Sequence, residues 1–170
     1  MNYKVNNEYN YEFENVKRIY FGSGKVFYVY ENETPLVSVE VNLITTDCFI
    51  DSIVVGDYLY IGNYTEGVYV INLKDFNFDN IPIDGYFGYF VKNQDCLYIL
   101  GCENVIAIDI DSNIVWKSDY LAVDGIVFEG IEGRIMNISC EMDPPGGWEY
   151  KKIDLLTGKT INSKKIFIER

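Results

Sequence analysis

The sequence has no histidine among its 170 residues. Histidine is the commonest general base near neutral pH and a frequent metal ligand, so its absence excludes Ser-His-Asp and Cys-His catalysis and histidine-based metal sites. No motif pairs a nucleophile with a base, so we predict that the protein is not an enzyme and has no catalytic residue. The alternative within enzymes is a weak glycosidase, which needs only two carboxylates, for example Asp84 and Asp124.

Positive charge is scarce: 14 Lys and Arg stand against 26 Asp and Glu, for a net charge of -12. Proteins that bind nucleic acids neutralise phosphates with cations, so the sequence predicts no nucleic-acid partner. The cations gather near the end of the chain, where residues 151–170 hold six Lys and Arg against two Asp and Glu. The acidic body favours a basic protein as partner, or the charge serves solubility alone.

Long apolar runs and paired cysteines are also missing. No run approaches the roughly 20 apolar residues of a membrane span, and residues 1–17 are too polar for a secretory signal. The cysteines have no C-x-x-C spacing, which predicts buried free thiols rather than a zinc site; they are Cys48, Cys96, Cys102 and Cys140. We therefore expect a cytoplasmic protein with no cofactor, no metal and no membrane contact.

The sequence does contain an internal repeat. Leu59, Leu97 and Ile135 recur at an even spacing, and Ile19 precedes Leu59 by nearly the same interval. Each repeat holds short alternating runs rich in Val, Ile, Tyr and Phe, separated by Gly, Asn or Asp, which is typical of antiparallel strands. The clearest repeat predicts strands over 85–92, 96–101, 105–110 and 114–121.

Four strands in about 40 residues correspond to one blade of a β-propeller. We therefore predict an all-β single domain over residues 1–170, built as a small β-propeller or as a curved open sheet. Its four repeats, each the length of one such blade, are expected at about 1–44, 45–83, 84–123 and 124–170. The sequence leaves open whether the repeats close into a ring and which oligomeric state the protein has.

Residues 105–117, VIAIDIDSNIVWK, resemble the repeat of PQQ-like, or quinoprotein-type, β-propellers. In that family a strand ending in Ala-hydrophobic-Asp is followed by a Thr-Gly-type turn and a strand ending in Trp. KKIDLLTGKTI, from Lys151 to Ile161, is a second copy with an intact Thr157 and Gly158. We expect Gly158 and Asn113 to supply the positive φ of a tight turn. Quinoproteins have about twice as many blades, so the resemblance does not imply a quinone cofactor here.

The stretch EMDPPGGWEY, residues 141–150, is expected to connect the second and third strands of the last repeat. The corresponding connections are GSGK (22–25), GNYTEG (62–67) and GCEN (101–104), and this one is the longest of the four. Insertions in repeat proteins often lie on the binding face. Trp148 is then either an anchor presented by a rigid loop or a cover for one end of the core.

A second recurrence points to the same face. Asp84-Gly85 and Asp124-Gly125 lie one repeat apart, and Asp47 marks a degraded third copy. Asp-Gly is also a common turn dipeptide, so the pattern is explained by turn chemistry alone or by a ring of carboxylates at one end of the repeats. The predicted partner-binding residues are Trp148, Asp143, Glu141, Asp84, Asp124, Asp47, Tyr64, Glu66 and Glu103.

These features predict a non-enzymatic protein-binding module that uses an acidic, aromatic face. A concrete version is a bacterial immunity-type protein that neutralises a basic toxin. The alternative is a carbohydrate- or calcium-binding module that uses the same carboxylates and aromatic rings.

Overall fold

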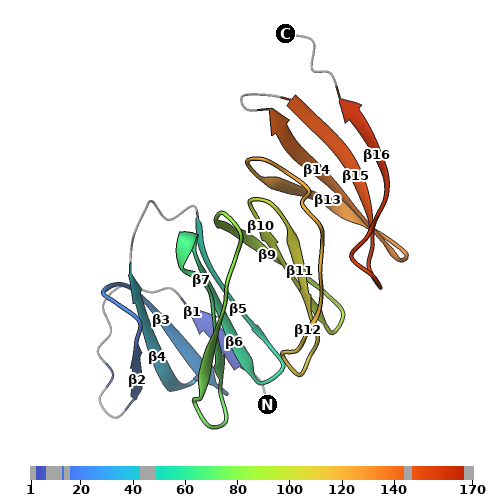
Figure 1. Ribbon diagram of the computed structural model, residues 1–170. Coiled ribbons are helices and arrows are strands. Elements are labelled where there is room, and N and C mark those ends of the chain that lie inside the picture. Colours follow the sequence, from blue (N-terminus) through green and yellow to red (C-terminus); the bar gives the residue numbers. More distant parts are fainter. Residues whose placement is uncertain (1–2, 7–12, 14–15, 43–48, 144–146, 167–170) are drawn as a thin grey trace. The chain divides into compact units, whose positions relative to one another are not determined.

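The computed structural model describes residues 3–6, 13, 16–42, 49–143 and 147–166, and these form an all-β fold (Figure 1). The strands make four four-stranded sheets. Within these residues there is no α-helix, and no helix is long and apolar enough to cross a lipid bilayer. The predicted all-β chain of four four-stranded units is therefore confirmed.

The chain folds as two compact units, Met1–Pro82 and Ile83–Arg170, each of which holds two sheets. The first sheet has the strand order β1-β3-β4-β2. Its strands are β1 (Tyr3–Asn6), β2 (Lys17–Tyr20), β3 (Gly24–Glu31) and β4 (Thr34–Asn42). The second sheet is a meander of β5 (Ile50–Val55), β6 (Tyr58–Asn63), β7 (Gly67–Asn72) and β8 (Phe78–Ile81), with a short 3-10 helix at Tyr64–Glu66.

The first sheet departs from the predicted repeat. We expected Ile19 to lie on a second strand and GSGK to connect that strand to the third, but GSGK connects β2 to β3, and β2 pairs parallel with β4. The reason is the turn at Asn32 and Glu33, whose φ values of 47° and 70° are those of a tight hairpin. This turn makes β3 and β4 the central hairpin, and β2 is left with the outer edge of the sheet.

The second unit consists of two meanders. The third sheet contains β9 (Phe87–Asn93), β10 (Cys96–Gly101), β11 (Val105–Ile108) and β12 (Ile114–Lys117). The fourth sheet contains β13 (Ile126–Glu132), β14 (Ile135–Asp143), β15 (Gly147–Asp154) and β16 (Thr160–Ile166). The predicted strand over 96–101 is confirmed, whereas the next two strands end earlier than predicted, at Ile108 and Lys117.

Strand alternation builds the core of the second unit, because every second residue of a strand points to the same side of the sheet. From the third sheet, Tyr98, Leu100 and Ala107 enter a buried cluster. From the fourth sheet, alternate residues of β14 and one residue of β15 join it: Met136, Ile138, Cys140 and Ile153. The third and fourth sheets therefore pack face to face through one apolar layer.

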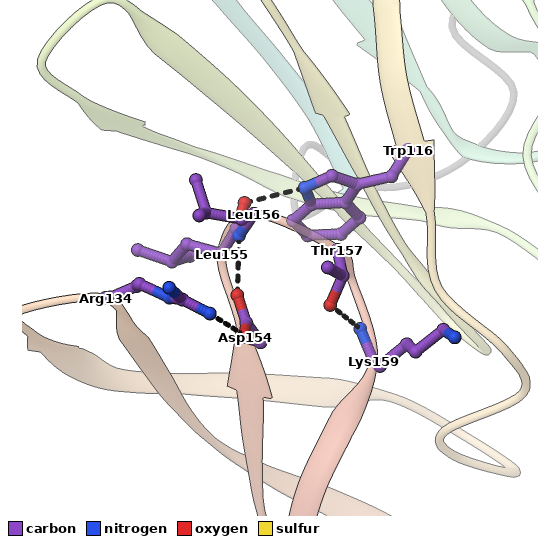
Figure 2. A network of polar contacts seen from close by, with 7 residues as sticks. All are labelled: Trp116, Arg134, Asp154, Leu155, Leu156, Thr157 and Lys159. Carbon is purple, nitrogen blue, oxygen red and sulfur yellow. Dashed lines mark hydrogen bonds and ion pairs between the residues drawn. The ribbon is translucent and has the colours of Figure 1, made fainter.

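Trp116 joins these two sheets from the outer strand β12. Its indole Nε1 donates a hydrogen bond of 2.7 Å to the backbone oxygen of Leu155, in the turn between β15 and β16 (Figure 2). Its ring lies against Gly158, where a Cβ atom would come within 2.5 Å of the indole Cε3. Only glycine leaves room for the ring at this position, and the φ of 70° also favours glycine.

The turns that follow β11 and β15 are held by their first aspartate. The carboxylate of Asp154 accepts a hydrogen bond from Leu156 N and forms an ion pair with Arg134 (Figure 2). Asp109 accepts bonds from the backbone N–H groups of Asp111 and Asn113. The pKa of each aspartate is lowered, mainly because these hydrogen bonds stabilise the charged form.

The expected positive φ at Asn113 is wrong. In the turn after β11 the positive φ, 68°, is that of Ser112. The cause is turn length: Asp109 N bonds Asn113 O, whereas Asp154 N bonds the oxygen of Lys159, one residue further along. The first turn therefore closes one residue earlier, and the left-handed position moves with it.

The contact between Trp116 and Gly158 can be tested with Gly158→Ala. We expect the free energy of unfolding to fall by about 2–4 kcal/mol, because the methyl group displaces the indole and a positive φ is strained for alanine. The matched control is Gly133→Ala, since Gly133 also has a left-handed φ of 60° but a Cβ there meets no atom within 4 Å. Urea denaturation should show a loss of about 1 kcal/mol for the control. Equal losses in both variants would contradict the packing role of Gly158.

Candidate functional site

Several loops of the second unit meet at one end of its two sheets. Cys102 N bonds Tyr86 O at 2.8 Å, which ties the β10–β11 connection to the segment before β9. Gly125 N bonds Cys102 O at 3.1 Å, and Glu141 N bonds Gly125 O at 3.1 Å. These bonds bring together the segments that carry five predicted site residues, three in connections and two at the end of β14, which we name the acidic end: Asp84, Glu103, Asp124, Glu141 and Asp143.

Asp84 is held by two neighbours at this end. Its Oδ2 accepts a hydrogen bond of 2.6 Å from Asn104 Nδ2 and forms an ion pair of 2.6 Å with Lys117 Nζ. The bond to Lys117 is the main cause of the lowered pKa of the Asp84 carboxyl. The next residue, Gly85, has a φ of 75°, and a Cβ there would come within 2.8 Å of Cys102 Cβ. The Asp84-Gly85 pair is therefore a tight turn against the β10–β11 connection.

Asp124 has a different partner. Its Oδ1 and its backbone oxygen accept hydrogen bonds from the Tyr86 hydroxyl at 3.0 and 3.2 Å. Burial and this bond to Asp124 raise the pKa of Tyr86. Asp84 and Asp124 thus each have a separate local contact, as turn chemistry predicts. Within the described residues, no three Asp, Glu, Cys or His side chains form a group that could hold a metal ion.

The 141–150 stretch does not form the long loop that we predicted. Glu141 pairs with Trp148, and Asp143 pairs with Gly147, so the inserted residues lengthen the β14–β15 hairpin. Trp148 lies on β15, an inner strand of the sheet with β14 on one side and β16 on the other, because it also pairs with Ile166 of β16. The reason is that pairing satisfies the backbone N–H and C=O groups of both arms. Pro144, Pro145 and Gly146 lie outside the described residues.

The remaining predicted site residues belong to the first unit. The Glu66 carboxylate accepts hydrogen bonds from Asn42 and Asn63 at 2.9 and 2.6 Å, and from the Tyr69 hydroxyl at 2.8 Å. Burial, together with this bond to Glu66, raises the pKa of Tyr69 to about 12. Tyr64 packs its ring on Phe49, with ring centroids 5.5 Å apart. Asp47 lies outside the described residues.

Sequence reasoning missed Lys151, a buried cation of β15. Its Nζ donates a hydrogen bond to the backbone oxygen of Leu121 and lies 3.6 Å from the Glu149 carboxylate. Lys151 therefore ties the segment before β13 to the middle of the fourth sheet. The sequence shows only two adjacent lysines after an alternating run, and nothing in it marks which of them is buried.

The described cysteines are free thiols. Cys102 and Cys140 are buried, as predicted, and Cys96 is half-buried. Burial raises the pKa of Cys140 to about 11 even though the nearby Lys151 lowers it, so this thiol stays protonated near neutral pH. Cys48 lies outside the described residues.

No protein-family model matches the chain, and no curated protein is similar to it in sequence. Solved structures are similar in fold. Hydrazine synthase of Kuenenia stuttgartiensis matches 84% of this chain with a TM-score of 0.55 at 16% identity. BamB of Moraxella catarrhalis matches 97% with a TM-score of 0.51 at 10% identity. The computationally designed protein Ika4 matches 72% with a TM-score of 0.51 at 12% identity.

The chain has a β-propeller-like fold. The matched structures include propeller proteins, and the four four-stranded sheets of this chain correspond to their blades. The chain spans 43% of the length of the hydrazine synthase chain, 53% of BamB and 76% of Ika4. At 10–16% identity these similarities establish the fold and leave the activity open.

The Asp84–Lys117 ion pair predicts a specific pH dependence. Because the folded state lowers the pKa of Asp84, its contribution to stability is present above the unfolded pKa of about 4 and is lost as the pH falls through the folded value. In Lys117→Met, carboxyl NMR titration should show the Asp84 pKa move up towards 4, with a smaller loss of stability between about pH 5 and 3. Lys92→Met, at an exposed residue of β9, is the control and should leave Asp84 unchanged. An unshifted Asp84 in Lys117→Met would show that the ion pair is absent in solution.

Proposed function

We propose that this chain is a non-enzymatic protein-binding module that docks a basic protein on its acidic end. The observation that carries the proposal is that backbone hydrogen bonds gather the segments carrying these five acidic residues at one end of the two sheets of the second unit. Clustered charge of one sign steers an oppositely charged partner and accelerates association.

The cations near this end reduce its negative charge only in part. Lys117 pairs with Asp84, and the charge of Lys151 is buried beside Glu149. The carboxylates of Asp124, Glu141 and Asp143 lie on the turn before β13 and along the extended hairpin, in exposed or half-buried positions. A cationic surface of a partner could therefore reach several carboxylates at once.

We further infer that the repeats are of the PQQ-like type. The support is the contact of Trp116 with Leu155 and Gly158, because it joins the tryptophan of one copy of the motif to the turn of the next. The motif thus acts as an architectural element that holds neighbouring sheets together, a role that needs no quinone.

The most specific version of the proposal is an immunity-type protein that neutralises a basic toxin in the cytoplasm. Two features support it: the acidity and the absence of histidine. Free thiols at Cys102 and Cys140 suit a reducing compartment.

Charge reversal tests the proposal. We expect the triple variant Glu103→Lys, Glu141→Lys and Asp143→Lys to lose a basic protein that the wild type captures from host lysate at low salt. Capture by the wild type should weaken steeply as salt rises to about 0.5 M, where exposed charges are strongly screened. Mass spectrometry and salt titration provide the readout.

The matched control carries the same change in net charge at the opposite end of the same sheets: Asp95→Lys, Asp111→Lys and Glu132→Lys. All six positions lie in the second unit, and surface changes of this kind should leave stability nearly unchanged. Equal capture by both triple variants would exclude the acidic end as the binding surface.

A further inference from the structure

The two faces of the fourth sheet differ in chemistry. Met136, Ile138 and Cys140 of β14 point into the core against the third sheet. By strand alternation, the residues between and beside them point to the opposite side, which we name the outer face. Its members on β13, β14 and β15 are Val127, Glu129, Asn137, Ser139, Glu141, Trp148, Tyr150 and Lys152. A hydrogen bond of 2.7 Å from Ser139 Oγ to Glu129 Oε1 joins two of them across the strands.

The outer face of the fourth sheet can be compared with the face of the third sheet that packs against the fourth sheet. There, Tyr98 pairs with Ala107, and Ala107 pairs with Trp116, and all three are buried against the fourth sheet. The corresponding row of the fourth sheet is Asn137, Lys152 and Asn162, which pair in the same order. Polar groups therefore replace the apolar layer and the docking tryptophan. The outer face is built for contact with a polar partner rather than for packing against a further sheet.

Two aromatic residues stand out on this polar face. Trp148 and Tyr150 lie two residues apart on β15, so their side chains point the same way about 7 Å apart. Both are half-buried. A residue with hydrogen-bonding groups lies directly across from each ring, because Glu141 pairs with Trp148 and Ser139 pairs with Tyr150. This row presents two aromatic rings with hydrogen-bonding groups beside them on β14.

Asn137, in the same strand row as Lys152, has a buried polar atom without a partner among the described residues. It is 4% exposed, and its Oδ1 is a buried acceptor with no hydrogen-bond partner in the described structure. A buried acceptor without a donor is costly, and such atoms are rare in folded proteins. Opposite it on β13 is Gly130, where a Cβ would meet no atom within 4 Å, so the neighbouring strand leaves open space. A hydroxyl group that entered this space could donate to the oxygen once the groups that cover Asn137 move aside.

We propose that the outer face binds a neutral polysaccharide. The Trp148 and Tyr150 rings provide two stacking surfaces for the C–H faces of successive sugar rings. Sugar hydroxyls donate to the Glu141 carboxylate and accept from Lys152, and one hydroxyl donates to Asn137 Oδ1 when the groups that cover it move aside. The carboxylates of Glu129 and Glu141 disfavour anionic chains such as nucleic acids or uronic-acid polymers. The proposal does not require protein docking at the acidic end, although Glu141 belongs to both surfaces.

Isothermal titration with cellohexaose, xylohexaose, mannohexaose and maltohexaose tests it. We expect the wild-type protein to bind at least one of these neutral oligosaccharides with a Kd of about 0.1–1 mM. Trp148→Ala should weaken that binding at least about tenfold, Tyr150→Ala should weaken it by a similar factor, and Trp148→Phe should retain most of it. Melting temperatures of the three variants establish that they fold.

Tyr120→Ala is the control, because Tyr120 is a 58% exposed tyrosine in the segment before β13, away from the outer face. It should bind as tightly as the wild type. Failure of all four sugars to bind at millimolar concentration overturns the proposal, and so does unchanged binding by folded Trp148→Ala. If Trp148→Ala instead removes a captured protein while no sugar binds, the outer face is a protein interface and the proposal is wrong.

Discussion

The fixed geometry of the second unit depends on the contact of Trp116 with the turn between β15 and β16. The indole N–H satisfies a backbone oxygen that the sheet does not use, and the ring occupies the space left by the missing side chain of Gly158. The contact links an outer strand of the third sheet to the fourth sheet at one end. At the other end, Leu121 N bonds Glu103 O and Val123 N bonds Glu141 O. Two sheets joined at both ends have little freedom to slide, and the acidic end inherits that rigidity.

The contacts that join the two sheets also explain why Lys151 can be buried. An ammonium group taken out of water is costly unless other groups replace its hydration. Leu121 O and the Glu149 carboxylate do so, and the lysine in turn fixes the segment that leads into β13. Asp124 lies only a few residues further along this segment, where Tyr86 holds its carboxylate. The position of the acidic groups thus follows from contacts made by neutral and basic residues that the charge pattern does not reveal.

Much of the fold could be predicted from local signals. The evenly spaced recurrence and the alternating runs predicted four strand-rich units. The Thr-Gly turn motif correctly predicted the positive φ of Gly158. Features that depend on pairing between distant residues could not be predicted. β2 pairs parallel with β4 because the turn at Asn32 and Glu33 closes a hairpin after it. Likewise, the insertion before Trp148 is compatible with a loop or with longer strands, and only the pairing of Glu141 with Trp148 decides between them.

That pairing changes the meaning of the candidate site. On a loop, Trp148 would have been one more member of the acidic end. On β15, alternation assigns its side chain to the outer face together with Tyr150, while Glu141 carries its charge on the same row. The extended hairpin therefore lies where the acidic end and the outer face meet. A strand offers less conformational freedom than a loop, so side chains on it lose less entropy when a ligand orders them. A regular hairpin is thus the better support for a row of stacking rings.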